Sequence, residues 1–341
     1  MAEKTVTFVV PSYNSAKTLR YCLDSFLVAE VFEDMEVLVV SDGSTDTTAA
    51  IAKEYAKQYP FIKLYEKENG GHGSVINFAA KIAQGRYLKV IDSDDKVQNL
   101  AAYVHCLKKT TSDIDVVFTN FRTIDIRSGN ARTYATSNIP FGEVMLFEEF
   151  WKHKQTVTDV CCFHGITYGT SFYNLCNITL SEGISYEDQE YATLPFVHVK
   201  TVLPLDLFLY DYTLGSADQS VSDDNQVKNF DQMLHVLWQL INSEPKNANA
   251  TVKSYFRFKQ SRKLLSCYTA ALIKNKNKKD GRRKAKELRS ALKQRNIFLF
   301  NSTRRAFYTC LLASFFGING NNLFKHQNSK IYRMLLKHIR R

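Results

Sequence analysis

The sequence has few of the features that mark disulfide-bonded, zinc-binding or membrane-spanning proteins. Its seven cysteines are an odd number in 341 residues, none follows the C-x-x-C spacing, and the adjacent pair Cys161 and Cys162 cannot readily form a useful cross-link. No apolar run approaches the roughly 20 residues that a membrane-spanning helix needs. The chain opens with MAEK and enters a strand pattern at once, which predicts no signal peptide. We therefore expect a reduced, cytoplasmic chain without a zinc site.

Acidic residues are almost absent from the C-terminal third. Residues 246–341 hold 25 Lys and Arg but only Asp280 and Glu287, a net charge of +23, whereas the rest of the chain carries −12. This division predicts an acidic body, residues 1–225, and a basic, mainly helical region, residues 226–341, that binds something anionic.

The partner of the basic region is open at this stage. Basic residues that alternate with apolar ones on helices favour an anionic membrane surface. Packing against the body or a second copy of the chain is the alternative. Nucleic-acid binding fits the charge, but no recognised motif supports it, so we expect no nucleic acid partner.

Strand and helix patterns alternate through the acidic body. Apolar runs are each followed by a polar turn, and apolar residues recur at helical spacing between them. Such alternation predicts an α/β fold with βαβ units and a mostly parallel sheet. The four turns after these runs should therefore lie at one edge of the sheet, where ligands bind in open α/β folds. The runs span residues 5–10, 36–40, 61–65 and 87–91, and the first predicted helix covers residues 15–28.

Three carboxylates directly follow the last of these runs, at Asp92, Asp94 and Asp95. Clustered carboxylates raise each other's pKa unless a cation lies among them. Oxygen ligands that leave coordination positions open suit Mg²⁺ or Mn²⁺ that also binds phosphate oxygens. The alternative is a capped turn, in which Asp92 or Ser93 accepts hydrogen bonds from the free N–H groups of the next helix.

The other three turns carry groups suited to a nucleobase and its sugar phosphate. They offer an aromatic face, amides, a carboxylate that can accept from a base N–H, and glycines that let backbone approach a ligand. Each residue taken alone is also explained as a packing or turn residue. The residues concerned are Pro11, Tyr13, Asn14, Asp42, Asn69 and Gly73.

Three stretches together resemble the nucleotide-sugar-binding half of family 2 glycosyltransferases: VTFVVPSYNSAKTLRYCLDS, VLVVSDGSTDTT and ENGGHGSVINFAAKIAQGRYLKVIDSDD. The resemblance covers roughly residues 5–220. It implies the GT-A fold of nucleotide-diphospho-sugar transferases, a mostly parallel sheet flanked by helices, here with a basic, mainly helical C-terminal appendage. No G-x-G-x-x-G follows the first strand, which excludes a dinucleotide-binding domain.

The resemblance also implies roles for the turn residues. It makes Asp92-Ser93-Asp94 the D-x-D motif, in which Asp92 and Asp94 bind a divalent cation, Mn²⁺ or Mg²⁺, and the motif holds the donor diphosphate. Asp42 reads the nucleobase, and Pro11 and Tyr13 line its pocket. Asn77 matches a recurrent asparagine of the family. Lys67 and Asn69 are weaker matches to family positions.

The segment ISYEDQEY, residues 184–191, resembles the E-D motif of the family, which supplies the catalytic base. By this resemblance Asp188 is the base, Glu187 positions it or the acceptor, and Glu190 or Tyr191 shapes the acceptor pocket. A base must accept the proton of the acceptor hydroxyl as the anomeric carbon is attacked. The alternative is an acidic first turn of a helix, which the helix dipole favours.

Two further polar residues flank this motif. His164 is a candidate contact to the acceptor or a phosphate, although an ordinary structural histidine is the better explanation. Gln219 lies in a polar loop that can fold over the donor in some relatives, and an ordinary loop residue is the equal alternative. The sequence lacks the Q-x-x-R-W signature of processive polysaccharide synthases, which favours a single sugar addition.

The sequence therefore predicts an inverting, metal-dependent transferase of the bacterial cell-surface glycan or glycoprotein type. It moves one sugar from a nucleotide-sugar, with UDP-hexose preferred, to a hydroxyl of a glycan, a glycoprotein or a lipid-linked acceptor. A location at the inner face of the plasma membrane and a homo-oligomer are further expectations. Two rivals are a nucleotidyltransferase, which would open with a Gly-rich loop bearing Lys or Arg, and an inert binding scaffold, which would have no chemical use for Asp188.

Overall fold

The computed structural model describes residues 4–215 and 222–317 of the chain. The chain divides into two units, unit 1 (Met1–Ser216) and unit 2 (Ala217–Arg341). The domain boundary that the sequence placed between residues 225 and 226 stays a prediction.

Unit 1 is built on a ten-stranded sheet. Its strand order is β3-β2-β1-β4-β9-β6-β10-β5, with β7 beside β6 and β8 beside β10. Strands β1 to β4 run parallel to one another, and β6 runs parallel to β10, while β9 lies antiparallel between β4 and β6. The strands are β1 (Lys4–Ser12), β2 (Met35–Asp42), β3 (Ile62–Lys67), β4 (Gly85–Val90), β5 (Lys96–Val97), β6 (Val116–Asp125), β7 (Ala131–Tyr134), β8 (Met145–Leu146), β9 (Ile166–Gly169) and β10 (Thr201–Leu214).

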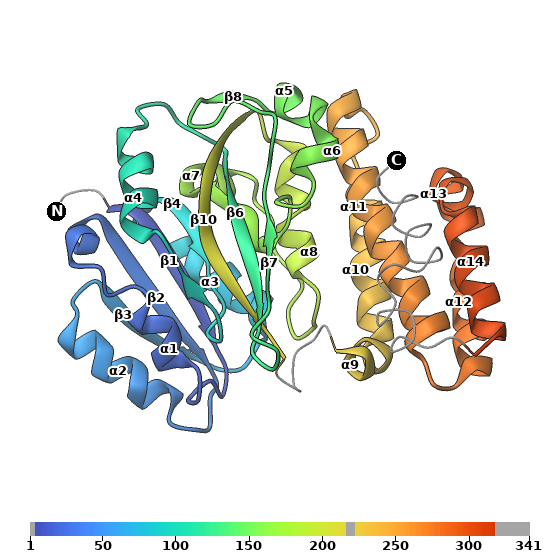
Figure 1. Cartoon of the computed structure of the whole chain (residues 1–341), viewed down its shortest axis with the longest axis horizontal. Helices are drawn as coiled ribbons and strands as arrows, with labels where there is room; N and C mark the ends of the chain where they lie inside the picture. The colour runs from blue at the N-terminus through green and yellow to red at the C-terminus, as the bar shows by residue number, and fades with distance from the viewer. Residues whose placement is uncertain (1–3, 216–221, 318–341) are drawn as a thin grey trace. The chain divides into compact units, whose positions relative to one another are not determined.

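Helices pack along the parallel strands of unit 1 (Figure 1). Helix α2 lies on β2 and β3, α3 on β1 and β2, and α4 on β1 and β10. Because the strands are covered, every residue of β1 after Lys4 is buried, as its continuous apolar run indicates. The predicted α/β fold is confirmed. The helices of unit 1 are α1 (Leu19–Asp24), η1 (Ala29–Asp34), α2 (Thr48–Gln58), α3 (His72–Ile82), α4 (Leu100–Lys109), α5 (Phe147–Lys152), α6 (Lys154–Val157), η2 (Phe163–Gly165), α7 (Thr170–Leu175), α8 (Asp188–Tyr191) and η3 (Leu194–Val197).

The first helix is shorter than the sequence predicts. The predicted span of residues 15–28 was wrong, because α1 covers only Leu19–Asp24 and the 3-10 turn η1 follows. Asn14 adopts the left-handed backbone region with φ of 49°. The Ser15 amide donates to Thr48 Oγ1 at 2.7 Å. The hydrogen bond joins the residues after β1 to the start of α2, and the helix begins only at Leu19.

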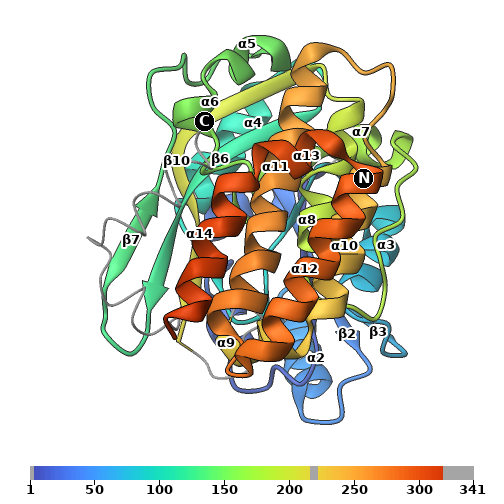
Figure 2. The ribbon, with the colours of Figure 1, turned by 90° about the vertical axis from the view of Figure 1, so that its right-hand side faces the viewer.

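The described part of unit 2 is helical, which confirms the predicted helical C-terminal region. Helices α10, α11, α12 and α14 run alongside one another (Figure 2). Helix α10 buries the predicted stripe that includes Met233, Val236, Leu237 and Leu240. Within the described ranges, no helix is long and apolar enough to cross a membrane. The helices are α9 (Asp223–Lys228), α10 (Phe230–Asn242), α11 (Ala250–Thr269), η4 (Ala270–Lys274), α12 (Lys278–Arg295), α13 (Ile297–Ser302) and α14 (Arg304–Phe315).

Candidate active site

The carboxyl ends of β1, β2, β3 and β4 lie at one edge of the sheet because these strands are parallel. Ser12 at the end of β1 pairs with Ser41 in β2, and Asp42 at the end of β2 pairs with Lys67 in β3. The turns that the sequence singled out therefore meet at this edge.

Asp42 is buried and its carboxylate accepts hydrogen bonds from the chain itself. Its Oδ1 accepts from Lys67 Nζ at 2.7 Å and from the Gly70 amide at 3.0 Å, and its Oδ2 accepts from the Gly71 amide at 2.7 Å. The carboxylate thus fixes the glycine-rich loop after β3. A nucleobase N–H would have to donate to a carboxylate lone pair of Asp42 that these three hydrogen bonds leave unused.

The loop after β1 lies beside Asp42. Pro11 is buried opposite Val40, whereas Tyr13 exposes 55% of its surface. The Asn14 side chain accepts from the Thr45 amide at 2.8 Å and so joins the loops after β1 and β2. The exposed ring of Tyr13 is the group of this loop that is free to stack on a ligand.

The glycine-rich loop docks against the segment that precedes the E-D motif. Gly71 has φ of 83°, and a Cβ there would lie 2.9 Å from the Gly183 amide nitrogen. A Cβ on Gly73 would lie 2.3 Å from the Ser181 carbonyl oxygen. The Gly183 amide donates to the Gly70 carbonyl at 2.7 Å. The lack of side chains at Gly71 and Gly73 therefore lets this loop pack closely against the backbone of Ser181 and Gly183.

Asn77 and Asn69 belong to the same junction. The Asn77 side chain donates to the Leu180 carbonyl and to Glu182 Oε1, and it accepts from the Leu180 amide. Asn69 lies against Gly43, where an added Cβ would approach Asn69 to 2.8 Å. The Asn77 side chain therefore links α3 to the segment before α8 through hydrogen bonds.

His72 joins the two halves of the site. Its Nδ1 lies 2.6 Å from Glu187 Oε1, and its Nε2 lies 3.0 Å from Asp92 Oδ1. Burial alone would lower the pKa of His72, but the hydrogen bonds and charges of Asp92 and Glu187 outweigh it and raise this pKa well above its ordinary value. One imidazole ring thus bridges the two carboxylates, with one ring nitrogen facing each of them.

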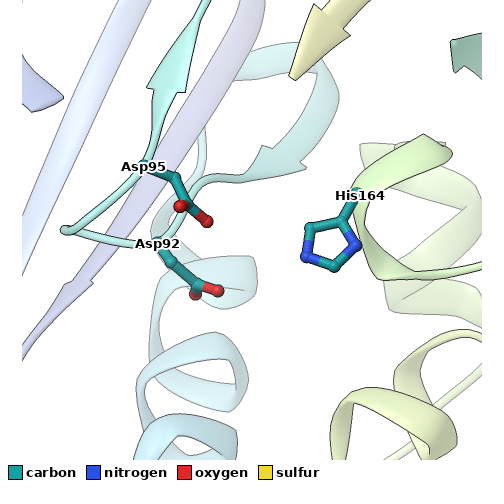
Figure 3. Close-up of side chains that lie close together, drawn as sticks. All are labelled: Asp92, Asp95 and His164. Carbon is teal, nitrogen blue, oxygen red and sulfur yellow. The ribbon is translucent and has the colours of Figure 1, made fainter. Parts of the chain in front are cut away.

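Asp92, Asp95 and His164 form a cluster whose ligand atoms all lie within 4.8 Å of one another. The two carboxylates, on the loop after β4, point toward the His164 ring (Figure 3). Burial, with the charges of Asp92 and Asp94, raises the pKa of Asp95 well above its ordinary value. Burial also opposes the ionisation of Asp92, but the hydrogen bond and charge of His72 lower its pKa.

The aromatic surroundings hold this cluster in place. The Tyr210 hydroxyl donates to Asp95 Oδ2 at 2.7 Å and accepts from the Asp92 amide at 3.0 Å. Tyr212 stacks on His164 with ring centroids 4.3 Å apart. Burial lowers the pKa of His164 to about 4, so its imidazole is neutral near pH 7. A neutral imidazole beside two carboxylates is a donor set that fits a divalent cation such as Mn²⁺.

The remaining residues of the predicted D-x-D motif lie on the same loop. Asp94 is partly exposed, whereas Ser93 is buried with its hydroxyl 2.7 Å from the Ser15 hydroxyl. The cluster of ligand atoms contains Asp92 but not Asp94.

The E-D pair divides into a buried and an accessible carboxylate. Glu187 is 3% exposed and held by His72, while Asp188 begins α8, is partly exposed, and accepts from Gln189 Nε2 at 2.7 Å. Tyr186, just before the pair, has φ of 76°, a strained value for a residue with a side chain.

Two other predicted contacts, Glu190 and Tyr191, lie in the core. Glu190 is buried and accepts from the Ser181 amide and hydroxyl. Tyr191 is fully buried, and its ring contacts Phe163 and Tyr168. That Glu190 or Tyr191 shapes the acceptor pocket stays a prediction. Gln219 lies outside the described residues.

Four residues of the site were not among the predicted site residues: His72, Lys89, Asp95 and Tyr210. His72 carries a signal, because it is an ionisable side chain set between the glycines at positions 71 and 73. Asp95 belongs to the carboxylate cluster, and Lys89 is a charge inside a run that was predicted to be buried. Tyr210 has no distinguishing signal within its strand.

Comparison with known proteins agrees with this geometry. Residues 7–174 match the profile described as glycosyl transferase family 2. The uncharacterized glycosyltransferase EpsJ of Bacillus subtilis is 28% identical over 211 residues, which are 61% of this chain and 60% of EpsJ. The chain thus spans less than two thirds of that relative.

Two solved structures share the fold. S. aureus TarS 1-349, in complex with UDP-GlcNAc, superposes with a TM-score of 0.61 at 18% identity over 92% of each chain. The mannosyltransferase PcManGT from Pyrobaculum calidifontis, in complex with GDP-Man and Mn²⁺, gives a TM-score of 0.51 at 14% identity over 96% of this chain and 89% of that one. The chain therefore carries a domain of glycosyltransferase family 2 with the GT-A fold.

Proposed function

We propose that this protein is an inverting, metal-dependent glycosyltransferase that moves a single sugar from a nucleotide-sugar to a hydroxyl of its acceptor. The observation that carries the proposal is the position of His72, which contacts Asp92 of the acid cluster and Glu187 of the E-D pair. The proposed donor site and the E-D pair, whose second member Asp188 is the proposed base, are thereby held on opposite sides of one imidazole, and such fixed placement favours a one-step displacement.

The roles of the residues follow from their positions. Asp92, Asp95 and His164 would hold a divalent cation, with Asp94 on the same loop as the further ligand that the D-x-D pattern implies. Such a cation stabilises the charge that develops on a diphosphate leaving group. Asp188 takes the proton of the acceptor hydroxyl. The buried Glu187 fixes the start of α8 through its bond to His72.

The donor is proposed to be UDP-linked and a hexose derivative. Support comes from TarS, whose structure holds UDP-GlcNAc. PcManGT holds GDP-Man with Mn²⁺, which supports a divalent cation and makes GDP-sugars the comparison donor. Tyr13 and Asp42 are proposed to contact the base, with Pro11 behind them. The proposed acceptor is a glycan, a glycoprotein or a lipid-linked sugar.

The proposal is tested by a screen of UDP- and GDP-sugars for hydrolysis by the full chain with Mn²⁺ or Mg²⁺. We expect nucleoside diphosphate release from one UDP-sugar, lost in EDTA and restored by added Mn²⁺. An equal rate in EDTA would contradict the metal dependence. Release of pyrophosphate in place of UDP would indicate a nucleotidyltransferase.

We also propose that the protein works in the cytoplasm, at the inner face of the plasma membrane. All seven cysteines are free thiols, which suits a reducing compartment. Helix α14 exposes Tyr308, Leu312 and Phe315 beside the exposed Arg304 and Arg305, a combination suited to anionic lipid. Sedimentation with anionic vesicles at low salt checks this, and no association there would rule it out.

A further inference from the structure

Lys89 is a buried lysine within the parallel sheet of unit 1. It lies on β4 and is fully inaccessible to solvent. Its ammonium donates to the carbonyl oxygens of Phe163 at 3.3 Å, His164 at 2.6 Å and Ile166 at 2.9 Å. Among the described residues, no carboxylate lies within ion-pair distance of it. The ammonium is therefore satisfied by backbone carbonyls of a single turn.

That turn is the one that carries His164. The carbonyls belong to η2 and the first residue of β9, where the chain is tightly folded: a Cβ on Gly165 would lie 2.2 Å from the Val160 carbonyl oxygen. Lys89 itself lies three residues before Asp92 on the same strand end. It therefore ties the backbone of the imidazole donor to the strand that delivers the carboxylates.

The energetic cost indicates that the ammonium does more than fill space. A buried charge without a counter-charge is expensive. Three carbonyl oxygens of one turn are what offsets this cost at Lys89. A methionine or leucine would fill the same volume within an apolar strand without it. Unlike those side chains, the ammonium forms hydrogen bonds with three backbone carbonyls at once.

We propose that Lys89 is a positioning residue of the metal site, because it fixes residues 163–166 so that His164 faces Asp92 and Asp95. This inference rests on the proposed function, since it takes Mn²⁺ as the cation bound by these side chains. Lys89 acts through His164 and touches neither the cation nor the donor.

The test is a titration of Mn²⁺ into the full chain with UDP present, followed by the electron paramagnetic resonance signal of free Mn²⁺. Lys89→Met should weaken Mn²⁺ binding by about 10-fold, as loss of an outer-shell partner does. Mg²⁺ prefers oxygen ligands, so its dissociation constant should change less. A general loss of folding would weaken both ions alike.

Arg86 provides a matched control on the same strand. Its guanidinium also donates to a backbone carbonyl, that of Leu107 at the end of the helix α4, away from the acid cluster. Arg86→Met should leave Mn²⁺ binding unchanged. If Lys89→Met does not fold, Lys89→Gln decides, because its neutral amide keeps two of the three N–H donors and should give a smaller loss of Mn²⁺ affinity.

A double-mutant cycle with His164→Asn tests whether Lys89 affects Mn²⁺ binding through His164. If Lys89 acts through His164, adding Lys89→Met to His164→Asn should change the Mn²⁺ dissociation constant little. Additive losses would overturn the inference, as would a folded Lys89→Met protein with wild-type Mn²⁺ affinity. A wild-type chain that binds no Mn²⁺ would overturn the metal part of the proposed function as well.

Discussion

An Asp188→Asn variant should lose turnover by roughly 10²- to 10⁴-fold, the usual contribution of a positioned general base. Asparagine keeps the shape of the carboxylate but cannot take the proton of the acceptor hydroxyl. Asp188 is partly exposed at the start of α8, so the substitution should leave the packing of unit 1 intact. Release of UDP from the donor gives kcat and KM, and calorimetry gives the donor Kd, which should hardly change.

Two further variants serve as a control and as a comparison for Asp188→Asn. Glu148→Gln makes the same change of carboxylate to amide at an exposed position of α5 and should leave turnover unchanged. Glu187→Gln weakens the bond to His72 and should lower kcat less than Asp188→Asn does. Near-normal turnover of Asp188→Asn would contradict the assignment and make Glu187 the next candidate for the base.

The second large effect is expected at Asp92, which joins the cation site to His72. Asp92→Asn removes a charged ligand and the partner of His72 Nε2. We expect Mn²⁺-dependent donor affinity to fall by more than the roughly 10- to 100-fold that changes in outer-shell groups cost. Calorimetric titration of UDP with Mn²⁺ present measures this fall. Transfer should be lost with it.

Asp113→Asn is the control for this change, because Asp113 is an exposed aspartate in the loop before β6. It should bind Mn²⁺ and UDP like the wild-type chain. Asp94→Ala extends the test to the second aspartate of the D-x-D motif, where we also expect weaker donor binding in Mn²⁺. Normal donor affinity in Asp92→Asn would show that the cation binds elsewhere.

Much of the fold was predictable because local patterns determine it. The apolar runs that end near Val10, Val40 and Val90 are continuous, as strands covered on both faces are, and the polar turns follow them directly. Parallel pairing then brings their ends to one edge. The span of α1 was not predictable, because the Ser15 amide donates to Thr48 Oγ1, which lies 33 positions further along the chain.

The connections within the site were less accessible to sequence analysis. His72 and Glu187 are 115 positions apart, and their contact depends on the glycine-rich loop docking against residues 181–183. In the same docked arrangement Asn77 hydrogen-bonds to the backbone of Leu180, although its position in the sequence suggested a ligand contact. The role of Lys89 was not predictable, because its three acceptors are backbone carbonyls, which side-chain identities do not reveal.

The central claim is that a divalent cation bound beside Asp92 holds the diphosphate of the donor. The most direct measurement is an anomalous difference map from crystals of the full chain grown with Mn²⁺ and UDP. The account predicts one strong Mn²⁺ peak bonded to the Asp92 carboxylate and His164 and to the diphosphate oxygens of UDP. Bound UDP without a Mn²⁺ peak, or a peak away from Asp92 and His164, would contradict it.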